Sequence, residues 1–167
     1  MDTTHHERES AALHRQPNSR HCFVCGLESA VGLKVRFDDN GVDEVRVKYT
    51  VDDQYQGYPG VVHGGVVAAM LDEVAGRVMM IDDHNRFFMT AKMTLRYRRP
   101  VPTETELTMV GRLVSESRRA VLAHAEIRLP DGSVAAEAEV TLVPMVDGVL
   151  PDADLEALGW RVYDDGG

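Results

Sequence analysis

Long apolar runs are missing from this 167-residue sequence. No segment approaches the roughly 20 consecutive apolar residues that a membrane-spanning helix needs. Residues 1–20 are polar and lack the apolar core of a secretory signal peptide. We therefore expect no association with a membrane and a location in the cytoplasm.

Basic residues are fewer than acidic ones. The sequence has 18 lysines and arginines but 27 aspartates and glutamates, which gives a formal net charge of -9. General nucleic-acid binding depends on a basic surface that neutralises phosphates. The charge balance therefore argues against a nucleic-acid partner. It also means that a polyanionic ligand needs a local cluster of cations.

Cysteine occurs only twice, as Cys22 and Cys25 in a Cys-x-x-Cys motif that follows His21. A structural zinc site normally takes four protein ligands, and the chain has no second cysteine pair. Metal binding across a dimer and a thioredoxin-like redox role are weaker alternatives than a packed turn leading into the first strand. The sequence thus predicts no metal site and no cofactor.

The length and a hydrophobic fraction of 44% are ordinary for one globular domain. Apolar residues alternate with polar ones in six segments, which predicts six half-buried strands at residues 33–37, 45–51, 91–97, 107–113, 121–129 and 134–142. Between the second and third segments, residues 63–81 carry apolar side chains at intervals of three and four, which predicts one long helix. The pattern indicates an α+β fold, a curved antiparallel sheet of five to six strands wrapped around one long central helix.

Three parts of the chain are expected from this pattern. Residues 1–20 hold little apolar periodicity and are predicted to form a disordered tail. Residues 21–146 form the folded domain. Residues 147–167 form a C-terminal extension, in which residues 152–158 have the pattern of a short helix closed by Gly159.

The start of the predicted helix is the most informative segment for function. His63, Gly64 and Gly65 lead into the apolar stretch, and Asp72 lies outside its apolar stripe. The first N–H groups of a helix lack internal partners and favour an anion or a polarised carbonyl oxygen, and glycines leave room for its approach. A tight loop-to-helix turn beside a solvated aspartate explains the same residues equally well.

Distance along the helix limits how this segment can act. Seven residues of helix place Asp72 roughly 10 Å from Gly65 along the axis. A catalytic base has to come within about 3 Å of its proton, or reach it through one water. One helix therefore does not bring both groups to one reacting carbon, whereas a two-fold dimer does. We expect a homodimer with a site shared between chains, or a tetramer of two such dimers.

These residues resemble a known family. The following segments are similar to hotdog-fold acyl-CoA thioesterases of the phenylacetate-pathway (PaaI-like) type: residues 55–65, Tyr-Gln-Gly-Tyr-Pro-Gly-Val-Val-His-Gly-Gly, the helix through Asp72 and Glu73, residues 89–91, and residues 96–101. Residues 22–26, Cys-Phe-Val-Cys-Gly, are similar to an opening seen in one branch of that superfamily. The resemblance covers about residues 22–145 and implies a hotdog thioesterase domain that hydrolyses an acyl-CoA thioester.

The resemblance also implies roles for particular residues. The Gly65 N–H would polarise the thioester carbonyl, and Asp72 of the partner chain would act as general base or as nucleophile. Thr90 would position water, and His63 would orient the loop or contact the thioester. Both Thr90 and His63 have purely structural readings, since threonine is common in strands. Glu73 is expected to form a surface or interface ion pair.

Substrate contacts follow from the same resemblance. We assign Gly64 and Gln56 to substrate binding, although relatives carry an asparagine where this loop offers only glutamines. Coenzyme A brings phosphates, and guanidinium groups suit phosphate recognition. Arg98 and Arg99 are the candidates for the nucleotide end, against the alternative of a solvated strand face. Competing functions are a hotdog dehydratase and a non-catalytic acyl-CoA-binding module.

Overall fold

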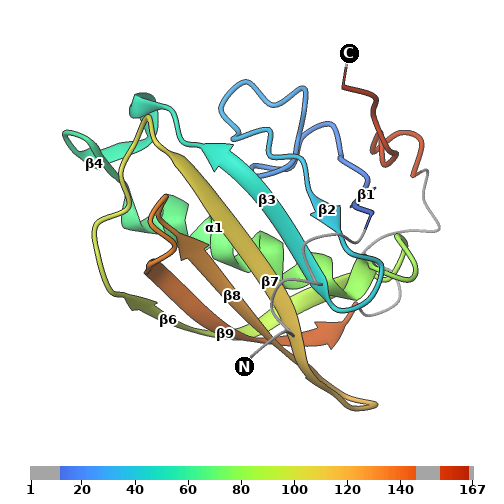
Figure 1. Ribbon diagram of the computed structural model, residues 1–167. Helices are drawn as coiled ribbons and strands as arrows, with labels where there is room; N and C mark the ends of the chain where they lie inside the picture. Colours follow the sequence, from blue (N-terminus) through green and yellow to red (C-terminus); the bar gives the residue numbers. More distant parts are fainter. Residues whose placement is uncertain (1–11, 146–154, 166–167) are drawn as a thin grey trace.

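The computed structural model describes residues 12–145 and 155–165, and its centre is one helix, α1 (Gly64–Arg77), lying on a seven-stranded antiparallel sheet. The sheet curves around the helix (Figure 1). Its strands run in the order β1-β2-β3-β7-β8-β9-β6. Their bounds are His14–Arg15 (β1), Asp38–Asp39 (β2), Glu44–Thr50 (β3), Glu106–Glu116 (β7), Val121–Arg128 (β8), Val134–Pro144 (β9) and Phe88–Tyr97 (β6).

Smaller elements precede and follow α1. A short 3-10 helix, η2 (Asp53–Tyr55), leads into a two-stranded sheet of β4 (Gln56–Tyr58) and β5 (Val61–Val62). A second 3-10 turn, η3 (Val78–Met80), continues α1 at its end. Among the residues described, no helix is both long and apolar enough to cross a bilayer.

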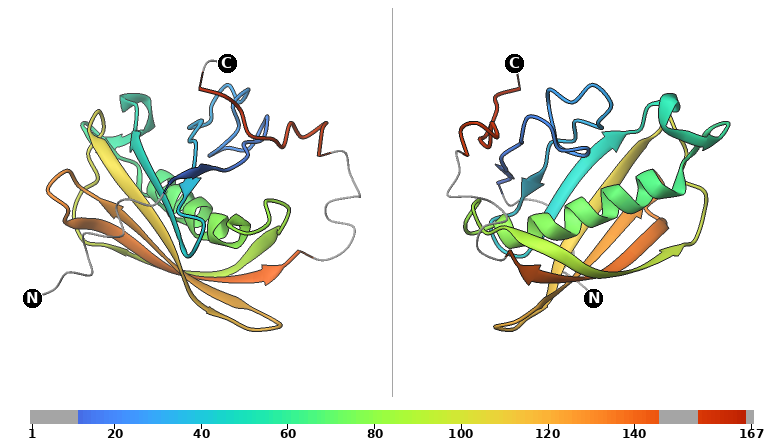
Figure 2. Two further views of the ribbon diagram at one scale, coloured as in Figure 1. Left: turned by 45° about the vertical axis from the view of Figure 1, so that its right-hand side comes forward. Right: turned by 180° about the vertical axis from the view of Figure 1, so that it is seen from behind.

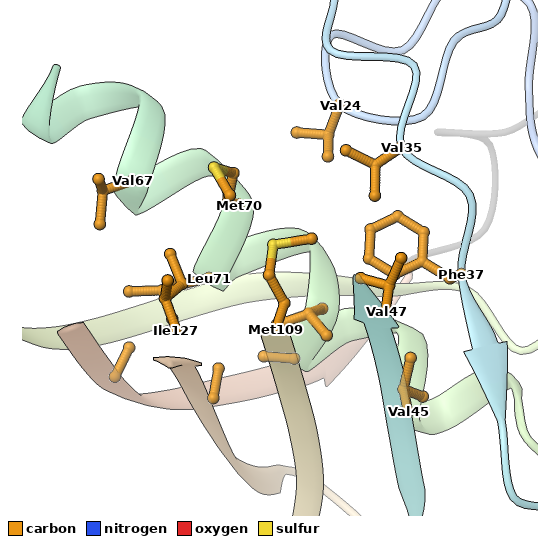
Figure 3. Close-up of a cluster of buried hydrophobic side chains, with 14 of the residues drawn as sticks. Val24, Val35, Phe37, Val45, Val47, Val67, Met70, Leu71, Met109 and Ile127 are labelled. Carbon is orange, nitrogen blue, oxygen red and sulfur yellow. The ribbon is translucent and has the colours of Figure 1, made fainter. Parts of the chain in front are cut away.

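The apolar stripe of α1 makes the core, as the sequence pattern predicts. Val67, Met70, Leu71 and Val74 are almost fully buried. Figure 3 shows Leu71 pointing toward the sheet, where Ile127 of β8 lies next to it, and Met109 of β7 rising from the sheet toward the helix. Burying a side chain of this size stabilises a protein by about 1.5–3 kcal/mol. The helix is thereby fixed against the concave face of the sheet (Figure 2).

Two strand predictions need correction. The sheet has seven strands rather than five to six, because the short β1 and β2 extend it beyond β3. The predicted strand at residues 33–37 is not one of them. Its alternation of buried and exposed side chains is present, but Lys34 has a φ of 57°, which interrupts extended backbone.

The predicted N-terminal tail also needs correction, because residues 12–20 belong to the fold. β1 pairs with β2, and Asn18 forms a bridge with Arg161 of the C-terminal segment. The buried Gln16 side chain donates hydrogen bonds to Asp39 and to the carbonyl of Arg77. The Gln16 side chain thus supplies hydrogen-bond donors to a buried carboxylate and a buried carbonyl. Apolar periodicity does not predict polar contacts of this kind. Residues 1–11 lie outside the described residues.

The C-terminal extension has turns where a short helix is expected. In its described part, residues 155–159 form hydrogen-bonded turns, with Gly159 N–H donating to the Glu156 carbonyl at 2.9 Å. Residues 152–154 of the expected helix lie outside the described residues. Trp160 returns to the domain, where its ring contacts Phe87 and its indole N–H donates to the His84 carbonyl.

Close packing of α1 on β7 depends on Gly111. A Cβ atom at this position would lie 2.4 Å from the Val74 carbonyl oxygen of α1. We expect Gly111→Ala to lower the free energy of unfolding by about 1–3 kcal/mol, because helix and strand have to separate. Gly76→Ala is the matched control, since nothing lies within 4 Å of a Cβ there and alanine favours a helix by up to about 1 kcal/mol. Urea denaturation of both variants checks this, and an unchanged stability of Gly111→Ala would contradict it.

Candidate functional site

A cleft of about 860 Å³ opens at the start of α1. Predicted residues that line it are His63, Gly64, Gly65, Arg98 and Arg99, joined by Tyr97 at the end of β6. Two chain segments that are far apart in sequence therefore meet there. The β4–β5 sheet closes another side through Gly57 and Tyr58. Gln56 is exposed in β4 next to these residues, but it does not line the cleft.

His63 caps the helix. Its Nδ1 accepts a hydrogen bond of 2.9 Å from the Gly65 N–H. This contact satisfies one of the N–H groups that a helix start leaves without an internal partner. The Gly65 N–H, predicted to polarise a carbonyl, is therefore engaged by the exposed His63 side chain and becomes available only when that side chain turns away.

Gly64 is the more accessible donor. In the part of the chain that the structure describes, no group accepts a hydrogen bond from the Gly64 N–H. The Tyr97 hydroxyl donates to the Gly64 carbonyl at 2.6 Å and holds β6 against the helix start. A Cβ at Gly64 would lie 3.2 Å from this hydroxyl, so glycine permits the close approach. The alternation of β6 predicts Tyr97 as an inward-facing residue but not this hydrogen bond.

Asp72 and Thr90 are brought together at a second point along α1. The Thr90 hydroxyl donates to Asp72 Oδ1 at 2.6 Å, and Asp72 is half-buried. This pairing joins two residues predicted for the same site. One carboxylate oxygen is thereby fixed, which leaves Oδ2 available to a ligand or a water.

A β-bulge in β6 explains why Thr90 reaches α1. The register with β9 shifts between Thr90 and Lys92. In a regular strand, Thr90 and Tyr97 would point to opposite faces, because side chains alternate and the two positions differ by an odd number. One extra residue at the bulge turns both side chains toward α1, consistent with the use of bulges to re-aim side chains.

The two parts of the predicted site do not meet within one chain. Neither Asp72 nor Thr90 lines the cleft at the helix start. Thr90 contacts the middle of α1 and Tyr97 contacts its first residue, so β6 runs back along the helix and spans the distance between them. The roughly 10 Å separation expected from the helix rise is thus present in the folded chain.

The two cationic candidates at the cleft are paired with acids or a hydroxyl. Arg98 donates to Glu137 Oε1 at 2.5 Å, and this hydrogen bond raises the pKa of Arg98 and lowers the pKa of Glu137. Arg99 donates to the Ser133 hydroxyl at 3.1 Å, with Asp131 at 4.0 Å. The two arginine side chains are exposed, so a phosphate can compete for their guanidinium groups at little cost.

Glu73 forms an ion pair within its own chain, but the partner is the buried Arg77 rather than a surface residue. Its Oε1 accepts from both Nε and Nη2 of Arg77, each at 3.0 Å. Arg77 is 1% exposed and also lies over the rings of Phe37 and Trp160. This pair is away from the cleft, as are Cys22 and Cys25.

The sequence and fold are similar to those of known proteins. Residues 59–136 match the sequence profile of the thioesterase superfamily. A thioesterase superfamily protein of known crystal structure is 37% identical, has a TM-score of 0.67, and is matched over 74% of this chain and 60% of its own. A streptococcal protein, smu.793 from Streptococcus mutans UA159, crystallised with acetyl-CoA, is 22% identical with a TM-score of 0.57, over 61% of this chain and 81% of its own.

One curated relative is an acyl-coenzyme A thioesterase. Acyl-coenzyme A thioesterase THEM4 of Bos taurus is 31% identical over 81 residues, which is 48% of this chain and 32% of that protein. The chain thus spans about a third of the length of this curated relative, and 60% of the solved relative that is 37% identical.

The free energy of unfolding tests whether His63 caps α1. We expect His63→Ala to lower the free energy of unfolding by about 1 kcal/mol, because the Gly65 N–H loses its acceptor. His63→Asn should retain most of the stability, since a short side-chain oxygen can accept the same bond. Chemical denaturation of the two variants measures the difference. Equal stability of His63→Ala and the unmodified protein would show that the side chain does not cap α1.

Proposed function

We propose that this chain is a PaaI-like member of the thioesterase superfamily, whose profile it matches and whose hotdog fold it has, and that it hydrolyses acyl-CoA thioesters in a site shared by two copies of the chain. The proposal rests mainly on the hydrogen bond from Thr90 to the Asp72 carboxylate. Thr90 lies on β6, and Tyr97 at the other end of the same strand contacts the helix start. The activity of the bovine relative supports the choice of substrate class. So does the acetyl-CoA crystallised with the streptococcal protein of the same fold.

A homodimer through β6 would assemble this site. Among the described strands, β6 pairs with β9 alone, so its other edge is open. An open edge of ten residues offers unpaired backbone groups to a second strand. Its exposed apolar side chains include Met89 at 42% and Tyr97 at 53% exposure. A closed two-fold pairing of β6 with itself satisfies this edge.

The register of such a dimer determines which groups face each other. If Phe88–Tyr97 pairs end to end with its two-fold copy, Thr90 of one chain lies opposite Leu95 of the other. That position is two residues, or about 7 Å, from Tyr97, which contacts Gly64. Asp72 of one chain then approaches the helix start of its partner. Two equivalent sites result, each with residues from both chains.

The chemistry follows from the groups that converge. The thioester carbonyl oxygen accepts from the Gly64 N–H at the partner's helix start, and from the Gly65 N–H once His63 turns away. Asp72 takes a proton from water, which attacks the carbonyl carbon. The tetrahedral intermediate then expels the CoA thiolate. Alternatively, Asp72 attacks directly and forms an anhydride that water hydrolyses. One donor to the developing oxyanion is typically worth about 3 kcal/mol of barrier.

The remaining predicted residues have supporting roles. Thr90 holds Asp72 Oδ1 and leaves Oδ2 for water. Arg98 and Arg99 at the cleft margin meet the CoA phosphates by exchanging Glu137 and Ser133 for the ligand. Gln56 in the adjacent β4 contacts substrate only if the loop moves toward the cleft. A dehydratase would use His63 as its base, and the Nδ1 of this side chain accepts a hydrogen bond from the Gly65 N–H in this structure.

Substitution of Asp72 tests the activity. We expect Asp72→Asn to lower kcat for thiol release from acyl-CoA substrates by about 100- to 10,000-fold, because the base or nucleophile is lost. Asp82→Asn, an exposed acid just beyond η3, is the matched control and should hydrolyse at the normal rate. A thiol-reactive dye measures release across a panel of acyl-CoAs.

Two results would contradict the proposal. If Asp72→Asn hydrolyses as fast as Asp82→Asn, Asp72 is not the catalytic group. If the unmodified protein binds acyl-CoAs but releases no thiol from any of them, the domain is a binding module instead.

A further inference from the structure

A second cluster of reactive side chains lies outside the cleft, where the N-terminal segment packs on α1. Cys22 and Cys25 flank a tight turn, and Glu73 of α1 faces them. The two Sγ atoms and a Glu73 carboxylate oxygen all lie within 4.8 Å of one another, and Cys22 Sγ is 3.8 Å from Glu73 Oε2. We propose that Cys22, Cys25 and Glu73 form a binding site for a Zn²⁺-type cation, with water as fourth ligand.

The turn between Cys22 and Cys25 favours the thiolate form of Cys22. The N–H groups of Val24 and Cys25 point at Cys22 Sγ, at 3.4 and 3.5 Å. Hydrogen bonds from backbone N–H groups favour the negatively charged form of the sulfur. Gly26 lets the turn close, since a Cβ there would lie 2.4 Å from the Cys22 carbonyl oxygen. Thiolates are the form in which cysteine binds metal.

Charge balance favours a divalent cation at this place. When an ion binds, both thiols lose their protons, so two thiolates and the Glu73 carboxylate bring three negative charges into a half-buried region. The buried Arg77 guanidinium compensates one of them, through Glu73 Oε1. A divalent ion neutralises the other two, so the five charged groups together have no net charge. Arg77 also orients Glu73, leaving Oε2 directed at Cys22, as an outer partner of a metal ligand does.

The distances fit a tetrahedral ion after small side-chain rotations. Zinc bonds of about 2.3 Å to sulfur and about 2.1 Å to oxygen place ligand atoms roughly 3.6–3.8 Å apart. The Cys22 to Glu73 distance of 3.8 Å already agrees with this value. Three protein ligands with an open fourth position are characteristic of accessible zinc sites.

The inference departs from the sequence-based expectation of no metal because the fold supplies a different third ligand. His21, next to the motif, is exposed and stands outside the cluster. Glu73 is far away along the chain, and only the packing of the turn on α1 brings it to the cysteines. A bound ion would tie the N-terminal segment to the helix that carries Asp72.

Cobalt titration of the protein tests the site. The protein is reduced, freed of metal with a chelator and titrated with Co²⁺ alone under anaerobic conditions. We expect one equivalent to give thiolate-to-cobalt charge-transfer bands together with the intense visible bands of tetrahedral cobalt. Zn²⁺ should bleach both by displacement. Binding should weaken as the pH falls, because protons compete for the thiolates.

Variants separate this ligand set from its neighbours. Cys22→Ser and Cys25→Ser should each lose the charge-transfer bands, and Glu73→Gln should weaken Co²⁺ binding at least tenfold, whereas His21→Ala should bind normally. Circular dichroism identifies any variant that fails to fold, and the remaining ones then decide. Absence of tetrahedral cobalt spectra in the reduced protein would overturn the proposal. A loss of binding in His21→Ala with normal binding in Glu73→Gln would also overturn it.

Discussion

Burial of one helix face against a curved sheet is the interaction on which the rest of this structure depends. Val67, Met70, Leu71 and Val74 leave water together, and Gly111 allows α1 to approach β7 closely. Because this face is fixed, the polar side of α1 has a fixed direction as well. The helix start, Asp72 and Glu73 are therefore presented at set positions along one rigid element, and each meets a different neighbour.

Strand β6 supplies the side chains that contact α1 at the proposed site. It runs back along α1, with Tyr97 at the helix start and Thr90 at Asp72. Among the described strands, β6 also forms the open edge of the sheet, so the edge proposed to pair with a second copy carries both of these contacts. Hydrolysis at such a site would depend on assembly, because the donors and the carboxylate of one chain are separated by about two turns of helix.

Periodicity predicted the parts of the molecule that hydrophobic burial determines. The long helix and the strands corresponding to β3, β6, β7, β8 and β9 follow from alternation and from the apolar stripe. Local geometry was not predictable in this way. The bulge that aims Thr90 at Asp72, the positive φ of Lys34 and the capping by His63 depend on single backbone or side-chain contacts. The approach of Glu73 to the cysteines depends on tertiary packing, which no spacing along the chain reveals.

The shared site is the central claim, and mixed dimers test it most directly. Asp72→Asn removes the carboxylate, and Gly65→Val obstructs the cleft at the helix start, so each variant alone should be inactive. Co-expression with two different tags isolates dimers that contain one chain of each. We predict that these mixed dimers recover about half of the normal turnover, since one of their two sites has an intact helix start and an intact partner aspartate. Mixed dimers as inactive as their parents, or a protein that remains an active monomer, would contradict the account.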